Sequence, residues 1–225
     1  SLRRRFMLLL LALFSLLFVV IIGLHLDDQD AAVQLRSRLQ ADREFLVDQI
    51  LRLTNKPVAY FKIDYSHWDD MVNFVSDPDP EWARINLDLE EVNHGVDGVW
   101  VLRPDFTVVQ GNTTLKLQQM QQFPLSPDQV QQLLSAGDVS QFFLRLGADV
   151  VLFEFAPVQP SDFSVDVEEP LGWLFVAKIW DAAYIRTVAD LLRGDAELVD
   201  SDTGPVESGG LTTSKTLANW QGEPV

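Results

Sequence analysis

The longest run of apolar positions in the chain lies near its N-terminus. Residues 6–26 carry no charged side chain, and 16 of these 21 residues are Leu, Ile, Val or Phe. As a helix rising 1.5 Å per residue the segment spans about 32 Å, which matches the hydrocarbon core of a bilayer. A cleaved signal peptide is the alternative, but no small-x-small cleavage site precedes Asp27. The pattern predicts a transmembrane helix over residues 6–26.

Charged residues on either side of this segment orient it in the membrane. Arg3, Arg4 and Arg5 precede it, whereas Asp27 and Asp28 follow it. Positive residues stay on the cytoplasmic side. We therefore expect a cytoplasmic tail over residues 1–5 and an extracytoplasmic domain over residues 27–225.

A helical period continues beyond the apolar segment. Residues 27–56 contain no Gly or Pro, so the membrane helix is expected to run directly into a long exterior helix that ends before Pro57. Apolar residues at helical spacing form a stripe that comprises Leu35, Leu39, Leu46 and Ile50. A membrane-proximal helix has little domain surface on which to pack. The stripe therefore predicts a homodimer seam, also used to pass signals along the helix.

Two more helices are predicted before residue 95. The first covers residues 58–76, because apolar side chains recur at intervals of three and four: Phe61, Tyr65, Trp68, Val72 and Val75. The proline-rich stretch 76–80 ends this helix. Asp79 as N-cap and Pro80 at the first position start another helix, expected to reach about Glu91.

After Gly95 the pattern changes to strands, with a few short helices. Helices are predicted from the Ser126 capping box to Gly137 and over Asp181–Leu192. Strands are predicted at Val96–Leu102, Phe106–Gln110, Gln141–Leu146, Val150–Pro157 and Gly172–Ile179, with weaker signals at Ala196–Val199 and within Leu211–Trp220. Most of these strands come as hairpins. The fold class is therefore α+β, with a mixed domain over residues 79–225 built on about five antiparallel strands.

Composition excludes several function classes. The formal net charge is −16, which argues against nucleic-acid binding because that needs a basic surface. There are no cysteines, so disulfides and thiolate metal sites are excluded. No phosphate-binding loop, nucleotide fingerprint or nucleophile elbow is present. We expect no cofactor and no metal.

Polar and aromatic side chains concentrate between residues 64 and 75. Asp69 lies four residues from both Tyr65 and Asn73, so the three share a helix face. One interpretation is a core whose carboxylates bond loop N–H groups; another is a ligand pocket. A third is a hydrolase that uses Asp69 with Asp64 or Asp70. A metal site at His67 is disfavoured because hard-cation ligands usually come from loops.

Several motifs together resemble the type-four CHASE domain over residues 28–201. They are Asp64-Tyr65-Ser66-x-Trp68-Asp69-Asp70, Asn73-Phe74-Val75, Pro78-Asp79-Pro80-Glu81-Trp82, Asn86-Leu87, the stretch GVDGVWVL at 95–102, Leu171-Gly172-Trp173-Leu174 and Tyr184-Ile185. The resemblance implies an extracytoplasmic sensor related to Cache and PAS-like folds. Such sensors precede a second membrane helix and a cytoplasmic histidine kinase or cyclic-di-GMP enzyme. We therefore expect a piece of a longer receptor, itself not an enzyme.

The candidate ligand-binding residues are polar and aromatic side chains of these motifs: Tyr65, Trp68, Asp69, Asn73, Asp97, Trp100 and Trp173. Carboxylates beside aromatic rings suit a small molecule with several hydrogen-bond donors, or a cation. The expected partners are thus such a ligand, the bilayer through residues 6–26, and a second copy of the chain. A structural or partner-binding ectodomain is the remaining alternative.

Overall fold

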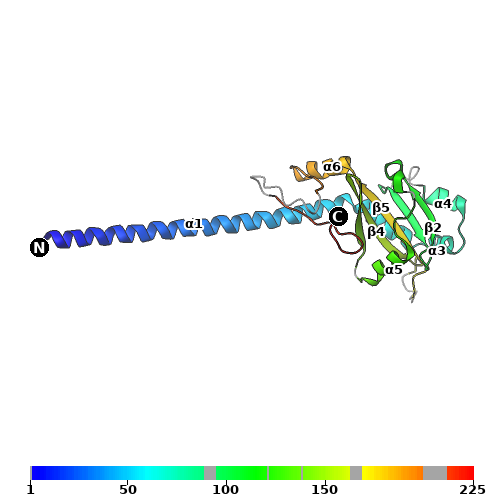
Figure 1. Ribbon diagram of the computed structural model, residues 1–225, viewed down its shortest axis with the longest axis horizontal. Coiled ribbons are helices and arrows are strands. Elements are labelled where there is room, and N and C mark those ends of the chain that lie inside the picture. Colours follow the sequence, from blue (N-terminus) through cyan, green and yellow to red (C-terminus); the bar gives the residue numbers. More distant parts are fainter. Residues whose placement is uncertain (1, 89–94, 121, 138, 163–168, 200–211) are drawn as a thin grey trace. The chain divides into compact units, whose positions relative to one another are not determined.

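The computed structural model describes residues 2–88, 95–120, 122–137, 139–162, 169–199 and 212–225 (Figure 1). Residues 2–6, 8–10, 12 and 19–33 are described by their backbone alone. The chain divides into two compact units. One unit comprises Ser1–Leu46 with Pro205–Ser214, and the other comprises Val47–Gly204 with Lys215–Val225.

A long helix, α1, covers Leu2–Thr54. Its continuity through residues 27–54 agrees with the absence of Gly and Pro after Leu24, and it ends three residues before Pro57. Within the residues described, no helix combines the length and the apolar character needed to cross a bilayer. Most side chains of segment 6–26 lie outside that description, so the transmembrane helix stays a prediction.

The single helix predicted over residues 58–76 is wrong, because the structure contains two helices there. Helix α2 covers Lys56–Ser66 and α3 covers Asp69–Ser76. Between them the carbonyl of Ser66 accepts a hydrogen bond from Gln159 N–H at 2.8 Å, and Trp68 is extended, with φ −140° and ψ 125°. A distant loop thus bonds the carbonyl that a continuous helix would use. The new N-terminus at Asp69 and Asp70 suits their negative charge.

Helix α4 covers Pro80–Asn86 and begins as predicted. The side chain of Asp79 accepts a hydrogen bond from Glu81 N–H at 2.8 Å, and Pro80 occupies the first turn. The helix ends earlier than the predicted Glu91, since Leu87 is its C-cap and is buried in the core. Residues 89–91 of that prediction lie outside the described residues.

The predicted sheet of five antiparallel strands is confirmed, in the order β2-β1-β5-β4-β3. The strands are β1 (Gly98–Leu102), β2 (Val108–Thr113), β3 (Gln141–Leu146), β4 (Asp149–Val158) and β5 (Gly172–Trp180). Hairpins join β1 to β2 and β3 to β4, whereas β5 joins the two hairpins at the centre. An almost uninterrupted apolar run suits β5 for this central place, because both its faces are covered.

Some local predictions differ from the structure. Strand β2 starts at Val108, because Phe106 lies in the turn with φ 67°. Residues 196–199 form no strand. Residues 212–220 form no strand either: Ala218 makes an isolated bridge with Pro224, and its carbonyl accepts a hydrogen bond from Phe143 N–H. A short 3₁₀ helix, η1 (Leu115–Met120), was not predicted.

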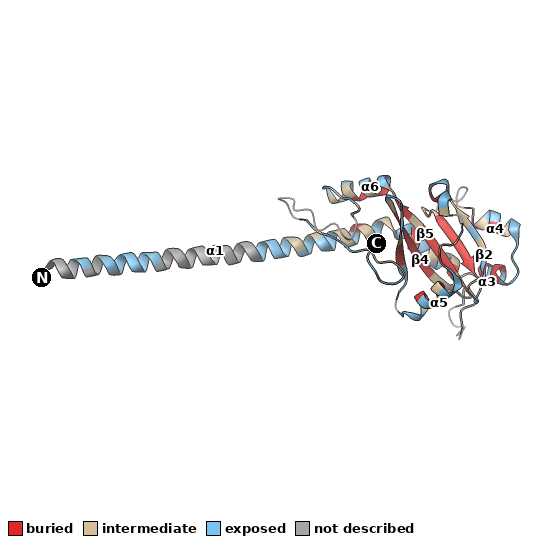
Figure 2. Ribbon diagram, in the orientation of Figure 1, coloured by how far each residue is buried: buried red, intermediate tan, exposed pale blue. Residues whose placement is uncertain are grey.

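Helices cover both faces of the sheet, and the inner strands β1, β4 and β5 are largely buried between them (Figure 2). One face packs against α2, α3 and α4 through a core that includes Phe61, Phe74 and Val99. The same face continues to the last residues of α1 and to α6 (Ala182–Leu192), where Ile50 contacts the cluster of Trp180 and Tyr184. The opposite face packs against η1 and α5 (Pro127–Ser135). The predicted capping box of Ser126 opens α5.

One ion pair lies in the core between α2 and the sheet. Lys62 Nζ donates to a carboxylate oxygen of Glu154 at 2.8 Å, and both side chains are largely buried. Glu154 lies in β4, whose other residues here are apolar. Buried charges persist only when paired, so this contact ties α2 to one register on the sheet.

Candidate functional site

The predicted aromatic residues of α2 and α3 pack on one another. The Tyr65 ring stacks on Phe61 with centroids 4.1 Å apart and meets Trp68 edge-on at 5.5 Å. Trp68 in turn lies 5.1 Å from Trp82, which stacks on Phe74 at 4.7 Å. Such pairs add to the apolar area that the rings bury. Tyr65 and Trp68 therefore form part of the packing that covers this face of the sheet.

The carboxylate of Asp69 binds a loop that is distant in the sequence. It accepts hydrogen bonds from Ser161 N–H and from Ser161 Oγ, both at 2.9 Å. Asn73 lies one turn further along α3 and is exposed, as are Asp64 and Asp70. This arrangement matches the interpretation in which a carboxylate of the motif bonds loop N–H groups.

The two predicted tryptophans of the sheet lie on the opposite face. Trp100 is 0% exposed and its ring lies 5.6 Å from Phe153 and 5.8 Å from Phe123. Trp173 is half-buried and packs against the same cluster. The structure thus separates Trp100 and Trp173 from Tyr65 and Trp68 by the thickness of the sheet.

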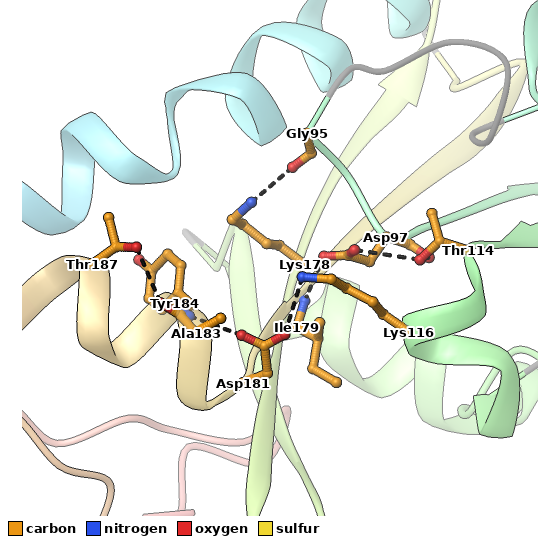
Figure 3. Close-up of polar contacts among 10 residues, drawn as sticks. All are labelled: Gly95, Asp97, Thr114, Lys116, Lys178, Ile179, Asp181, Ala183, Tyr184 and Thr187. Atoms are coloured by element: carbon orange, nitrogen blue, oxygen red, sulfur yellow. Dashed lines mark hydrogen bonds and ion pairs between the residues drawn. The ribbon is translucent and has the colours of Figure 1, made fainter.

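Asp97 alone among the predicted ligand residues lines a pocket where β5, the start of α6, η1 and the end of α1 meet (Figure 3). The pocket has a volume of about 590 Å³. Its walls comprise Thr54, Gly95, Val96, Asp97, Thr114, Leu115, Lys116, Lys178, Ile179, Asp181, Ala183, Tyr184 and Thr187. This size falls in the usual range for small-molecule sites.

An ion pair closes one side of the pocket. Lys116 Nζ donates to a carboxylate oxygen of Asp181 at 3.0 Å, and the other oxygen caps α6 by accepting from Tyr184 N–H at 2.8 Å. Burial alone would raise the pKa of Asp181, but the hydrogen bonds from Tyr184 and Lys116 outweigh it and lower that pKa. The hydrogen bond to Asp181 raises the pKa of Lys116.

Asp97 is held by neighbouring backbone and hydroxyl groups. One carboxylate oxygen accepts from Ile179 N–H at 3.0 Å and the other from Thr114 Oγ1 at 3.3 Å. Its backbone N–H also extends the ladder to Ala177 in β5. The Asp97 carboxylate therefore has a fixed position at the pocket wall.

Lys178 projects from the central strand into the pocket. Its Nζ donates to the Gly95 carbonyl at 2.8 Å and lies 5.9 Å from the centroid of the Tyr184 ring (Figure 3). Burial lowers the pKa of Lys178, and the nearby charge of Lys116 lowers it further, against the raising effect of Asp97. The amino group of Lys178 is therefore poorly solvated.

Tyr184 connects the pocket to the end of α1. Its hydroxyl lies 2.8 Å from Thr54 Oγ1 and donates to Asn55 Oδ1 at 3.1 Å. The ring stacks on Trp180 with centroids 5.0 Å apart. Burial raises the pKa of the Tyr184 hydroxyl, so it stays protonated and can donate. A wall residue of the pocket thus contacts both residues at the junction of α1 and α2.

Sequence reasoning missed Lys116, Lys178, Asp181 and Tyr184 as pocket residues. Lys178 could have been identified from the sequence, because it is the one charged residue within the apolar run of β5. A charge on a central strand requires a nearby polar space or partner. Lys116 could not, since it lies in a 3₁₀ turn that was not predicted.

Comparison with known families identifies the fold. The CHASE4 domain family matches residues 51–199, more than half of the chain. The chain belongs to the CHASE4 family. The matched region begins in the last turn of α1 and ends after α6, so the CHASE4 domain contains all five strands and the pocket.

Other comparisons add little. No curated protein sequence matches the chain. Among solved structures, the chain is similar to the periplasmic domain of LuxQ from Vibrio cholerae, with 8% sequence identity and a TM-score of 0.46. The similarity covers 79% of this chain and 86% of that one.

Membership establishes the general role of this CHASE4 domain. CHASE4 domains are extracytoplasmic sensor domains of membrane receptors and not catalytic domains. The predicted family and its sensor class are thus confirmed.

Proposed function

We propose that this CHASE4 domain is the ligand-binding input of a bacterial transmembrane receptor, with the pocket around Lys178 as its ligand site and α1 as its output. The proposal rests on the position of Thr54. This residue ends α1, lines the pocket and contacts Tyr184, another wall residue. A ligand in the pocket would therefore adjoin the end of α1, the helix that contains the predicted membrane segment.

The coupling rests on the hydroxyl of Tyr184. It contacts Thr54 and Asn55, which are the last residue of α1 and the N-cap of α2. A ligand shifts an equilibrium only by its differential affinity for two states. In our proposal the ligand favours one position of Tyr184 and α6, and so one arrangement of the α1 end.

Residues 6–26 are proposed to carry this change across the inner membrane to a cytoplasmic histidine kinase or cyclic-di-GMP enzyme. We also propose a homodimer through α1. Support comes from Leu35, Leu39 and Leu46, whose side chains are 58%, 42% and 45% exposed. Ile50, also predicted for the seam, is only 7% exposed and packs in the core of its own domain. The proposed seam is therefore Leu35, Leu39 and Leu46.

The ligand site is tested by filling the pocket. Ala183 lines it and is exposed, so Ala183→Phe is expected to occupy the pocket without disturbing the core. Ala182 precedes it in α6, is equally exposed and does not line the pocket, so Ala182→Phe is the matched control. Thermal unfolding of the full chain in lipid nanodiscs is measured against a panel of small metabolites.

A ligand of the pocket raises Tm in the wild type and in Ala182→Phe but not in Ala183→Phe, since binding to the native state stabilises it. A compound that raises Tm equally in all three proteins binds elsewhere. If no compound distinguishes Ala183→Phe from the control, this pocket is not the sensor site.

A further inference from the structure

The pocket wall contains four charged side chains, and three of them have either an ion-pair partner or two hydrogen bonds from described residues. Asp181 accepts from Lys116 and from Tyr184 N–H, while Asp97 accepts from Ile179 N–H and Thr114 Oγ1. Lys116 is neutralised by Asp181. Of the two pocket lysines, Lys178 has no ion pair with a carboxylate among the residues that the structure describes.

The donors of Lys178 are also incompletely used. An ammonium group has three N–H donors. Within the described ranges, one of them donates to the neutral Gly95 carbonyl and none meets a carboxylate. Tyr184 offers the ammonium only the face of its ring. Because the lysine stems from the central strand, its backbone position is rigid.

The remaining wall is suited to the body of an organic molecule. Val96, Leu115, Ile179 and Ala183 contribute apolar surface next to the lysine. A cationic ligand would meet two lysines and two carboxylates that are already bonded. An anion would instead neutralise the unpaired lysine, and charge-assisted hydrogen bonds of this kind are strong.

We propose that the ligand is a small organic carboxylate whose carboxylate group pairs with the Lys178 ammonium while its apolar part rests against Val96, Leu115 and Ala183. This inference rests on the proposed sensor function and names the class of its ligand. It departs from the donor-rich or cationic ligand that carboxylates beside aromatic rings suggested in the sequence. The lowered pKa of Lys178 agrees with it, since an anion would restore the solvation that burial removes.

The test uses three probes of nearly equal shape: benzoate, benzamide and benzylamine. Each is titrated at constant ionic strength into the full chain in nanodiscs, and binding is measured by calorimetry and by Tm. We expect benzoate to bind at least tenfold more tightly than benzamide, and benzylamine not to bind. Lys178→Met is expected to weaken benzoate at least tenfold, and Lys178→Arg to retain it. Lys215→Met, which changes an exposed lysine outside the pocket, is the control.

A second readout keeps the test independent of mutant folding. In wild-type protein with ¹³C-labelled lysine, the pKa of Lys178 is expected to rise when benzoate binds, because the bound anion favours the charged ammonium. Absence of benzoate binding, an unchanged Lys178 titration, or equal binding by Lys178→Met overturns the proposal. Stabilisation by inorganic phosphate alone also overturns the carboxylate class.

These outcomes separate the two proposals. If benzylamine or benzamide binds in place of benzoate and Ala183→Phe abolishes that binding, the carboxylate class is wrong and the sensor pocket stands. If benzoate binds wild type and Ala183→Phe equally, benzoate binds elsewhere and the carboxylate class is wrong for this pocket. The sensor pocket itself fails only if no compound of the panel distinguishes Ala183→Phe from Ala182→Phe.

Discussion

At the scale of single residues, Asp181 combines two interactions that are usually separate. One oxygen caps α6 through Tyr184 N–H, and the other pairs with Lys116 at the pocket. The cap gives a hydrogen-bond partner to a backbone N–H of the first helical turn that has none within the helix. The ion pair is partly exposed to solvent, which weakens it. The two contributions therefore differ in size, and substitutions can separate them.

Asp181→Ala is expected to lower the free energy of unfolding by about 1–2 kcal/mol, because α6 loses its cap. Asp181→Asn keeps an N-cap oxygen and loses only the ion pair, which is expected to cost less than about 1 kcal/mol. Urea unfolding of the full chain measures both. Equal losses in the two variants would show that the cap contributes nothing.

The pH dependence of these variants follows from the lowered pKa of Asp181. The unfolded chain takes up the proton near the ordinary value of 3.8, before the folded protein does. The stability from the Asp181 charge is thus present above that pH and is lost as pH falls through the lower, folded pKa. Wild type and Asp181→Asn are expected to converge in stability below about pH 3.8.

At the scale of elements, helix α2 is held on the sheet partly by a buried charge. The Lys62–Glu154 ion pair joins α2 to β4, and little solvent reaches either partner. Removal of one partner leaves the other charge buried and unpaired, whereas removal of both leaves an apolar contact. The losses of stability caused by the two single substitutions are therefore not expected to add in the double variant.

Lys62→Met or Glu154→Leu alone is expected to cost about 3–5 kcal/mol. The double variant Lys62→Met/Glu154→Leu is expected to cost less than either single change, since no charge remains in the core. A double-mutant cycle by chemical denaturation measures the coupling. Additive losses would mean that the pair is open to water.

At the scale of the whole molecule, the proposed homodimer depends on which side of α1 two copies share. Leu39 and Leu46 lie on the exposed apolar stripe of α1, whereas Ala41 lies about 200° around the helix from Leu39 by the 3.6-residue period. A dimer seam on this stripe would bring like positions of two chains together.

Leu39→Cys and Leu46→Cys are therefore expected to form intersubunit disulfides in membranes, while Ala41→Cys is not. Oxidation followed by non-reducing electrophoresis measures the products. The chain has no cysteine of its own, so each product reports one position. Equal cross-linking at Ala41, or none at Leu39 and Leu46, would contradict the seam.

Interactions between near neighbours in the chain could be predicted from the sequence. Pro57 ended α1, Asp79 and Ser126 capped their helices, and the central apolar run became β5. Each of these features depends on backbone sterics, local hydrogen bonds or the periodicity of apolar side chains. All three are determined by residues that are close together in the sequence. The motifs also sufficed to recognise the CHASE4 family.

Only the tertiary structure decided where these elements meet. Gln159 N–H bonds the Ser66 carbonyl and separates α2 from α3, although the apolar period continues through both. Ile50 has the spacing of the α1 stripe, yet it packs in the core of its own domain.

The pocket likewise joins Thr54 to Tyr184 and Gly95 to Lys178, which lie far apart in the chain. The sequence by itself determined most of the elements, the α+β class and the family. Which residues share the pocket followed from long-range packing, because no local period records a contact between distant segments.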